Sequence, residues 1–253
     1  MVSRLISPKE RGEFLKGVVV KGRRRKYYRV VRADRWYGGI ATADCVGCNL
    51  SCLFCWSDKP RNHPEKIGQF YDPEEIAEEL IACAQRKGYK QLRISGNEPT
   101  IAKEHLLLLL EKIEGRGFIF ILETNGTLID EEYAKDLRSF RSLRVRVSLK
   151  GTNPKEFSLL TGAEEEGFSM QINALFNLVR NKVRSHPAVM LSFSPPENFE
   201  KLKILLGKID RQLVEQLEEE YIFLYPPVKK RLEAKGLKPI VAYSPNRIPE
   251  GLV

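Results

Sequence analysis

Three cysteines lie within eight residues of this chain, at Cys48, Cys52 and Cys55. Thiolates are soft ligands that suit zinc or an iron–sulfur cluster. Three of them can bind three irons of a cubane, which leaves the fourth iron open to a ligand from outside the protein. A structural zinc site needs a fourth protein ligand, for which Cys45 and His63 are the nearest candidates. The spacing favours an open, reactive cluster, with a zinc- or cluster-stabilised binding protein as the alternative.

A second group of polar residues, Ser95, Gly96, Asn97 and Glu98, directly follows a strand-like run at 91–94. Small residues let the backbone approach a ligand, and the Glu98 carboxylate can accept hydrogen bonds from an ammonium group. A plain strand-to-helix turn with a surface glutamate would have the same composition. Because this segment accompanies the cysteines, we predict that it binds a ligand.

The cysteine spacing, with Phe54 directly before the third cysteine, resembles the signature of the radical S-adenosylmethionine (SAM) superfamily. The resemblance implies a [4Fe–4S] cluster on the three cysteines and SAM on its open iron. It also implies reductive cleavage of SAM to a 5′-deoxyadenosyl radical, with Phe54 packed near the adenine. The segment from Ser95 to Glu98 is similar to the family's Gly-Gly-Glu-Pro, which holds the SAM amino group, although Asn97 replaces the second glycine.

Two further strand ends resemble the pyruvate formate-lyase activating enzymes of this superfamily. Glu123-Thr124-Asn125-Gly126 is similar to their Asp-Thr-Asn-Gly, and Ser148-Leu149-Lys150 to their Asp-Leu-Lys. Each departure removes or displaces a carboxylate in a region where those enzymes have a monovalent cation site. The resemblance implies further SAM contacts at the strand ends, by Thr124, Asn125, Ser148, Lys150, Ser192 and Leu224.

A more local resemblance runs from Cys52 to Trp56. The tRNA wybutosine-synthesising radical SAM enzymes carry a similar Cys-x-Phe-Cys-Trp. The combined resemblance covers roughly residues 38–240.

Short apolar runs alternate with longer amphipathic stretches from about residue 38 onward. Each run has the length and composition of a strand, and this alternation is typical of parallel strands with helical crossovers. The runs are 39–42, 91–94, 118–122, 145–149, 189–193 and 221–224, and the helices are predicted over about 72–87, 103–114, 130–138, 153–160, 168–182, 197–206 and 227–235. Six units are fewer than a closed barrel needs. We therefore predict an α/β fold, an open partial (β/α)6 barrel of parallel strands with the cluster loop after the first strand.

The positive charge gathers at the N-terminus. Residues 1–32 hold eleven Lys or Arg against Glu10 and Glu13, which equals the net charge of +9 of the whole chain. We therefore predict a basic N-terminal appendage over 1–37 and the partial barrel over 38–253. Arginines and tyrosines at 23–28 could bind the phosphates and bases of a nucleic acid, or the segment is a solvated hairpin or meets an acidic protein.

The rest of the composition bears on where the protein works. No run of about 18 apolar residues is present, and the N-terminus lacks the apolar core of a secretory signal. Five cysteines, three of them clustered, do not suggest a disulfide framework. We expect a cytoplasmic protein without membrane contact.

These observations predict a radical SAM enzyme that abstracts hydrogen from a substrate at the mouth of the barrel. An open barrel favours a macromolecular substrate, through protein activation or modification. The alternative is a tRNA- or RNA-modifying enzyme, favoured by the basic segment and Trp56. The chemistry implies a low-potential ferredoxin or flavodoxin as reductant, and the sequence does not identify a catalytic side chain.

Overall fold

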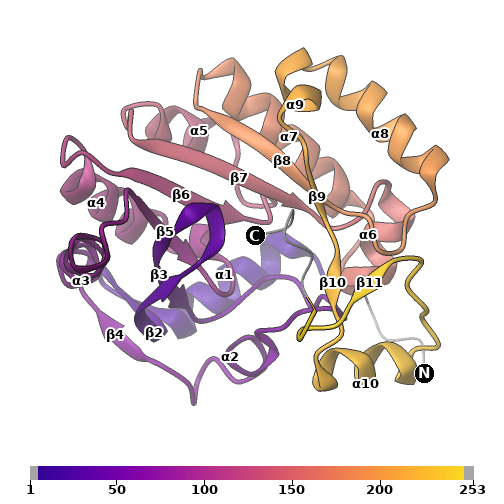
Figure 1. Ribbon diagram of the computed structural model, residues 1–253, viewed down its shortest axis with the longest axis horizontal. Coiled ribbons are helices and arrows are strands. Elements are labelled where there is room, and N and C mark those ends of the chain that lie inside the picture. The colour runs from indigo at the N-terminus through magenta and orange to yellow at the C-terminus, as the bar shows by residue number, and fades with distance from the viewer. Residues whose placement is uncertain (1–4, 248–253) are drawn as a thin grey trace.

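The computed structural model describes residues 5–247 and contains one large mixed sheet (Figure 1). Six of its strands are parallel and follow the chain in order from one side of the sheet to the other. They are β3 (Ile40–Cys45), β5 (Gln91–Ser95), β6 (Ile119–Thr124), β7 (Leu143–Leu149), β8 (Ser185–Met190) and β9 (Glu218–Glu220). Within residues 5–247 the order runs from β1 to β9 without joining its ends, so the predicted open barrel is confirmed.

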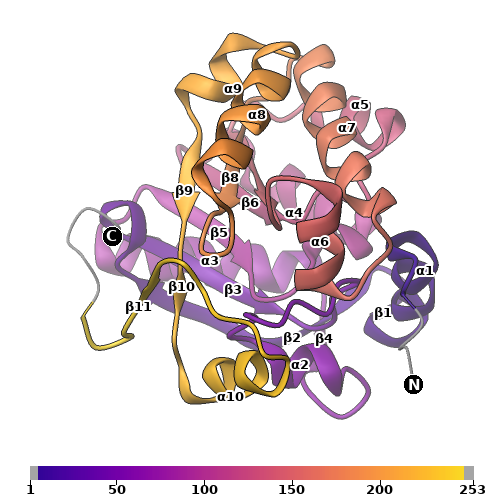
Figure 2. The same ribbon diagram turned by 90° about the vertical axis from the view of Figure 1, so that its right-hand side faces the viewer.

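Helices cover one face of this sheet, and their apolar sides form the main core with it (Figures 1 and 2). They are α3 (Pro73–Lys87), α4 (Lys103–Ile113), α5 (Glu131–Leu137), α6 (Pro154–Thr161), α7 (Glu166–Arg180), α8 (Pro196–Gly207) and the short α9 (Arg211–Glu215). Asp72 and Glu75 form the capping box that the sequence of α3 predicts, and Gly88 ends the helix with a φ of 70°. The capping residues thus determine where the crossover helix α3 begins and ends.

The N-terminal segment is part of the sheet. It forms α1 (Pro8–Val19), β1 (Val20–Lys21) and β2 (Arg24–Asp34), followed by the turn η1 (Trp36–Gly38). Strand β2 pairs antiparallel with β3, and the short β4 (Gln69–Tyr71) pairs with β2. The domain boundary at residue 37 stays a prediction, but the residues before it extend the barrel by an antiparallel edge.

The last unit differs from the prediction in one respect. The sixth parallel strand is β9, an acidic segment, whereas the predicted strand at 221–224 lies in a separate pair. That pair joins β10 (Ile222–Phe223) to β11 (Ala242–Tyr243), with α10 (Pro226–Ala234) between them. The apolar content of 221–224 reflects packing with α10. Within the described residues, no helix is long and apolar enough to cross a membrane.

Candidate active site

The three clustered cysteines lie on the loop between β3 and the short α2 (Asp58–Asn62). Cys48 Sγ is 3.9 Å from the side-chain nitrogen of Asn125, at the end of β6. Burial raises the pKa of Cys48, and the neighbouring Cys52 raises it further. Burial likewise raises the pKa of Cys52 to about 11, although the Lys150 ammonium opposes this. Such thiols ionise when a metal replaces the proton, so this donor set fits an iron–sulfur cluster.

The other cysteines are not part of this group. Cys45 is fully buried and Cys83 is nearly so, and both belong to the main core. Within residues 5–247, no three His, Cys, Asp or Glu side chains converge closely enough to hold a single metal ion. His63 is exposed and pairs loosely with Glu65, at 4.0 Å.

The main chain of the cluster loop is held from its outer side by arginines. Arg61 donates to the carbonyl of Cys52 at 2.7 Å. Arg231, on α10, donates to the carbonyls of Leu53, at 2.9 Å, and Cys55. These carbonyls face the arginines, while Cys48 Sγ faces the strand ends. Sequence reasoning missed both arginines, because neither has a local pattern that marks it.

Glu98 is the hub of a buried hydrogen-bond network on the inner side of the loop. Its side chain is 1% exposed. One carboxylate oxygen accepts from the backbone and hydroxyl of Thr100 and from the hydroxyl of Thr124; the other accepts from the backbone of Asn125, at 2.7 Å. A carboxylate offers about four acceptor sites. Protein donors therefore saturate one oxygen, the other accepts a single hydrogen bond, and Glu98 fixes the end of β6.

Gly96 and Asn97 bring the backbone after β5 close to the cluster loop. Gly96 has a φ of 98°, and a Cβ there would lie 3.0 Å from the backbone nitrogen of Cys45. The Asn97 side chain accepts from Gly47 at 2.8 Å and donates to the carbonyl of Ser57 at 3.1 Å. The asparagine that departs from the family pattern thus ties both ends of the loop to β5.

Asn125 connects β6 to the cysteine motif itself. Its side-chain nitrogen donates to Asn49, at 2.8 Å, as well as approaching Cys48. Gln171, on α7, donates to the carbonyls of Asn125 and Ser148. Asn49 and Gln171 are fully buried functional residues that sequence reasoning missed, although Asn49 lies inside the motif.

An apolar wall borders the same site. The rings of Phe54 and Phe193 are 6.4 Å apart, and both rings and Leu224 pack against the buried cluster that contains Met190. Ser192 is fully buried, and its hydroxyl accepts from the backbone of Ile222 at 2.8 Å. The structure therefore places Phe54 and Leu224 in one apolar cluster, whereas the Ser192 side chain connects the segment after β8 to β10.

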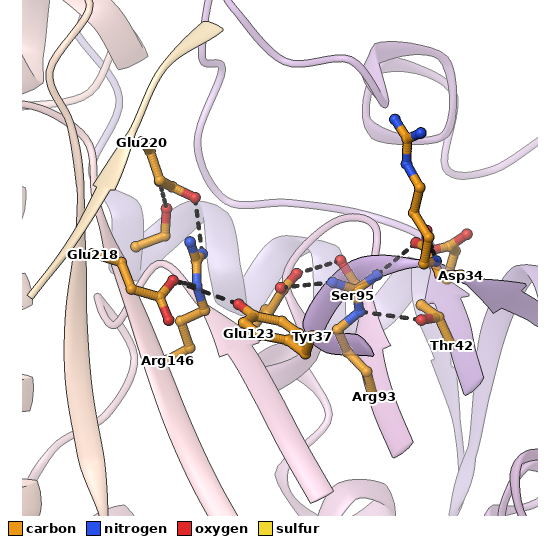
Figure 3. Close-up of polar contacts among 12 residues, drawn as sticks. Asp34, Tyr37, Thr42, Arg93, Ser95, Glu123, Arg146, Glu218 and Glu220 are labelled. Atoms are coloured by element: carbon orange, nitrogen blue, oxygen red, sulfur yellow. Dashed lines mark hydrogen bonds and ion pairs between the residues drawn. The ribbon is translucent and has the colours of Figure 1, made fainter. Parts of the chain in front are cut away.

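The remaining predicted contacts lie over the face of the sheet that the helices leave free. The Ser148 hydroxyl donates to Glu220 at 2.6 Å and accepts from Lys150. The Ser95 hydroxyl donates to Glu123 at 2.6 Å. Both serines thus connect the ends of the strands to a set of charged residues on the free face of the sheet. We call this set the interior charge ladder: Asp34, Arg93, Glu123, Arg146, Glu218 and Glu220 (Figure 3).

Each arginine of the interior charge ladder lies between carboxylates from other strands (Figure 3). Arg93 meets Asp34 at 2.8 Å and Glu123 at 2.9 Å, and Arg146 meets Glu218 at 2.6 Å and Glu220 at 2.8 Å. Burial alone would raise the pKa of Glu220, but the Arg146 charge and neighbouring donors lower it to about 2. Burial would also raise the pKa of Glu218, but the His186 imidazole, 2.9 Å from one of its oxygens, and the Arg146 charge lower that pKa to about 2.

Part of the basic N-terminal segment lies inside the protein, while Lys21, Arg23, Arg24 and Arg29 are exposed. Tyr27 and Arg25 are each 1% exposed. Arg25 donates to the carbonyls of Pro99 and Glu98, both at 2.7 Å, and Tyr27 meets His105 at 2.9 Å. The expectation that this tyrosine stacks on bases and this arginine binds phosphate is therefore wrong, because β2 turns both side chains into the fold. Arg24 stays exposed.

Comparison with known proteins agrees with this site. The profile of the Radical SAM superfamily matches residues 44–206, which is more than half of the chain. The matched region begins just before the cluster loop and extends through β8.

Curated relatives share part of their length with this chain. A protein of Peptoclostridium acidaminophilum named GTP 3′,8-cyclase is 33% identical over 144 residues, which cover 55% of this chain and 39% of that protein. A probable GTP 3′,8-cyclase of Thermococcus kodakarensis is 27% identical over 199 residues, covering 74% of this chain and 62% of the relative. The chain thus spans less than two thirds of the length of these relatives.

Solved structures show the same fold at low sequence identity. The structure of anSMEcpe with bound AdoMet and a Cp18Cys peptide has a TM-score of 0.54 and 23% identity, covering 70% of this chain and 48% of the other. TYW1 with a lysine-pyruvate adduct bound has a TM-score of 0.53 and 16% identity, covering 77% and 72%.

Proposed function

Because the chain belongs to the radical SAM superfamily, we propose that its three clustered cysteines hold the [4Fe–4S] cluster and its strand ends bind SAM. When bound, these two groups supply one-electron cleavage of the SAM sulfonium bond and hydrogen abstraction from a substrate. The observation that carries the proposal is the position of Cys48 and Cys52. Cys48 Sγ lies 3.9 Å from the side-chain nitrogen of Asn125 at the end of β6, and the charge of Lys150, just after β7, lowers the pKa of Cys52.

We propose that different residues at the strand ends bind different parts of SAM. The Phe54 and Leu224 wall receives the adenine, because both are partly buried apolar groups in one cluster. Lys150 and Ser148 bind the SAM carboxylate, since an ammonium and a hydroxyl are suitable donors. The backbone from Ser95 to Asn97 meets the amino group, and the lack of a Cβ at Gly96 lets this backbone pack against Asp44 and Cys45 at the end of β3.

Other residues of the network act by positioning. Glu98 orients Thr124 and Asn125 through its own hydrogen bonds. Its second oxygen accepts only one of these bonds, from the backbone of Asn125, and so keeps an acceptor site for the SAM ammonium. Asn125 directs its amide toward Cys48, and a hydrogen bond to a ligand sulfur shifts the reduction potential of a cluster. Thr124 and Ser192 maintain the backbone that meets SAM.

For the substrate we propose a polypeptide segment that enters the open barrel. The sheet does not close between β9 and the strands at its other end, which supports this, because an extended chain can approach the strand ends through that gap. The peptide in the anSMEcpe structure is consistent with it. A second candidate is a nucleotide, which the relatives named GTP 3′,8-cyclase favour. The RNA alternative loses its support from Arg25 and Tyr27, which are buried.

The test is anaerobic reconstitution with iron and sulfide, reduction with dithionite, and assay of 5′-deoxyadenosine released from SAM. We expect Cys48→Ala, Cys52→Ala and Cys55→Ala each to lose release and most bound iron. Cys83→Ala is the matched control, because this cysteine packs in the core away from the loop. A colourless protein that binds one zinc per chain, or release that survives in the three variants, would overturn the proposal.

The same assay distinguishes the two proposed substrates. Added GTP should neither raise 5′-deoxyadenosine release nor give a nucleotide product if the substrate is a polypeptide. Conversion of GTP, detected by mass spectrometry, would instead establish the nucleotide candidate.

A further inference from the structure

The cluster loop has two chemically different sides. Cys48 Sγ lies toward Asn125, and the charge of Lys150 acts on Cys52 from the strand ends. The carbonyls of Cys52 and Cys55 instead point to Arg61 and Arg231, on α2 and α10. A substrate at the strand ends occupies the inner side. A partner on the outer side is separated from it by the loop itself.

The outer side carries a strong positive charge. Residues 225–247 contain six Lys or Arg against a single acidic residue, Glu233. Arg231 pairs with Asp58 at 2.7 Å, which joins α10 to α2 beside the loop. The two helices lie next to each other in both views (Figures 1 and 2).

Several side chains of these helices and their flanks remain exposed. We define the outer basic surface by Trp56, Lys59, Lys230, Lys235 and Lys238. Trp56 directly follows the last cysteine and is 51% exposed. The structure shows no ion pair for the four lysines among residues 5–247. Tryptophan is enriched at protein-binding surfaces, and exposed lysines around it would attract a partner of negative charge.

We infer that the outer basic surface binds an acidic one-electron donor protein, such as a flavodoxin or ferredoxin. This inference rests on the proposed function, because it supplies the electron that SAM cleavage requires. The donor loses one electron and the cluster held by the cysteines gains it, without transfer of a proton or atom. An electron can cross the loop, whereas a substrate atom on the outer side cannot reach SAM.

The contacts of Arg61 and Arg231 give this surface a direct connection to the cluster ligands. Each guanidinium bonds to the carbonyl of a cysteine, and each belongs to a helix that borders the surface. The charges of Lys59, Lys230 and Lys238 would attract an acidic partner and raise the rate of encounter. We therefore expect donor binding to depend strongly on ionic strength.

The test uses the reconstituted full chain and a bacterial flavodoxin with its NADPH-dependent reductase. In the variant Lys59→Glu/Lys230→Glu/Lys238→Glu, we expect the Kd for oxidised flavodoxin to rise by at least about tenfold. The KM for flavodoxin in 5′-deoxyadenosine release should rise in parallel. Dithionite is a small reductant that needs no docking, so the dithionite-driven rate should be unchanged.

The matched control is Lys90→Glu/Arg116→Glu/Lys208→Glu, which changes the charge equally in loops away from the cluster loop. It should bind flavodoxin like the wild type. An unchanged Kd and KM in the first variant would overturn the inference. Loss of bulk tRNA binding with unchanged flavodoxin binding would overturn it in favour of a nucleic acid. No dithionite-driven release from the wild type would instead refute the proposed function and this inference with it.

Discussion

Arginines in two regions of this molecule have the same side chain and opposite surroundings. In the interior charge ladder, Arg146 lies between two carboxylates and is 9% exposed. In the N-terminal segment, Arg23 pairs with Asp72 and Glu74 while about half of its side chain meets water. Arg25, two residues later, is buried yet meets only carbonyls. The charge and exposure of the partners, more than the residue type, therefore decide what each arginine contributes.

The largest effect should come from Arg146→Met. The change leaves Glu218 and Glu220 without the charge that keeps them ionised, and breaking such a buried pair costs about 3–5 kcal/mol of unfolding free energy. Urea unfolding followed by circular dichroism measures it. Arg144→Met, on the same strand, is the control, because Arg144 meets only nearby carbonyls. If both variants lost the same unfolding free energy, the carboxylate partners of Arg146 would not explain its contribution to stability.

Acid should weaken the same region. Unfolded glutamates take up protons near pH 4.3, whereas Glu218 and Glu220 stay charged to about pH 2. The unfolded state therefore binds protons first, and stability falls as the pH drops from about 4.3 toward 2. The urea midpoint of the wild type should decrease across this window. If the urea midpoint of Arg146→Met fell as steeply with pH as that of the wild type, groups other than Glu218 and Glu220 would cause the decrease.

A smaller effect is expected from Arg25→Met. The variant removes hydrogen bonds to the carbonyls of Glu98, Pro99 and Val46 without leaving a charge unpaired. We expect a loss of about 2 kcal/mol in unfolding free energy, since a hydrogen bond to a charged group contributes about 1.5–3 kcal/mol. Arg24→Met, at an exposed position, should cost almost nothing in the same unfolding experiment. A larger loss of unfolding free energy in Arg25→Met than in Arg146→Met would contradict the expected order of the two effects.

The smallest effect should follow Arg23→Ala. Exposed ion pairs contribute about 0.2–1 kcal/mol and weaken with salt. We expect a loss below about 1 kcal/mol at low ionic strength, which shrinks further in about 0.5 M NaCl. Thermal or urea unfolding at the two salt concentrations measures it. A large loss that is insensitive to salt would mean that Arg23 behaves like the ladder.

The parts of the fold that depend on local patterns were predictable. The strands β3, β5, β6 and β7 and the capping box at Asp72 follow from periodicity and turn chemistry, whereas the short β4 was not predicted. Segment 218–220 escaped prediction because three consecutive glutamates do not resemble a strand. They form one here because Arg146, more than seventy residues earlier, binds two of them. Likewise, the burial of Arg25 depends on carbonyls that are distant in the chain.

The candidate site divides in the same way. The cysteines and Phe54 are marked by spacing, so the sequence alone located them. The hydrogen-bonding partners of Glu98 depend on how β5 and β6 meet, so sequence reasoning could not show that its carboxylate also accepts from Thr124 and Asn125. No local sequence pattern predicted that Arg231 would donate hydrogen bonds to the carbonyls of the cluster loop.

That last contact has a consequence for biosynthesis. Cys55 and Arg231 are 176 residues apart. At about 5–20 residues per second, a ribosome needs roughly 10–35 seconds to add the second after the first. Throughout that interval the cysteines are present while one of the two arginines that fix their main chain does not yet exist. Iron and sulfide delivered during synthesis would meet an incompletely held loop, so the cell has reason to load the cluster after the chain is released.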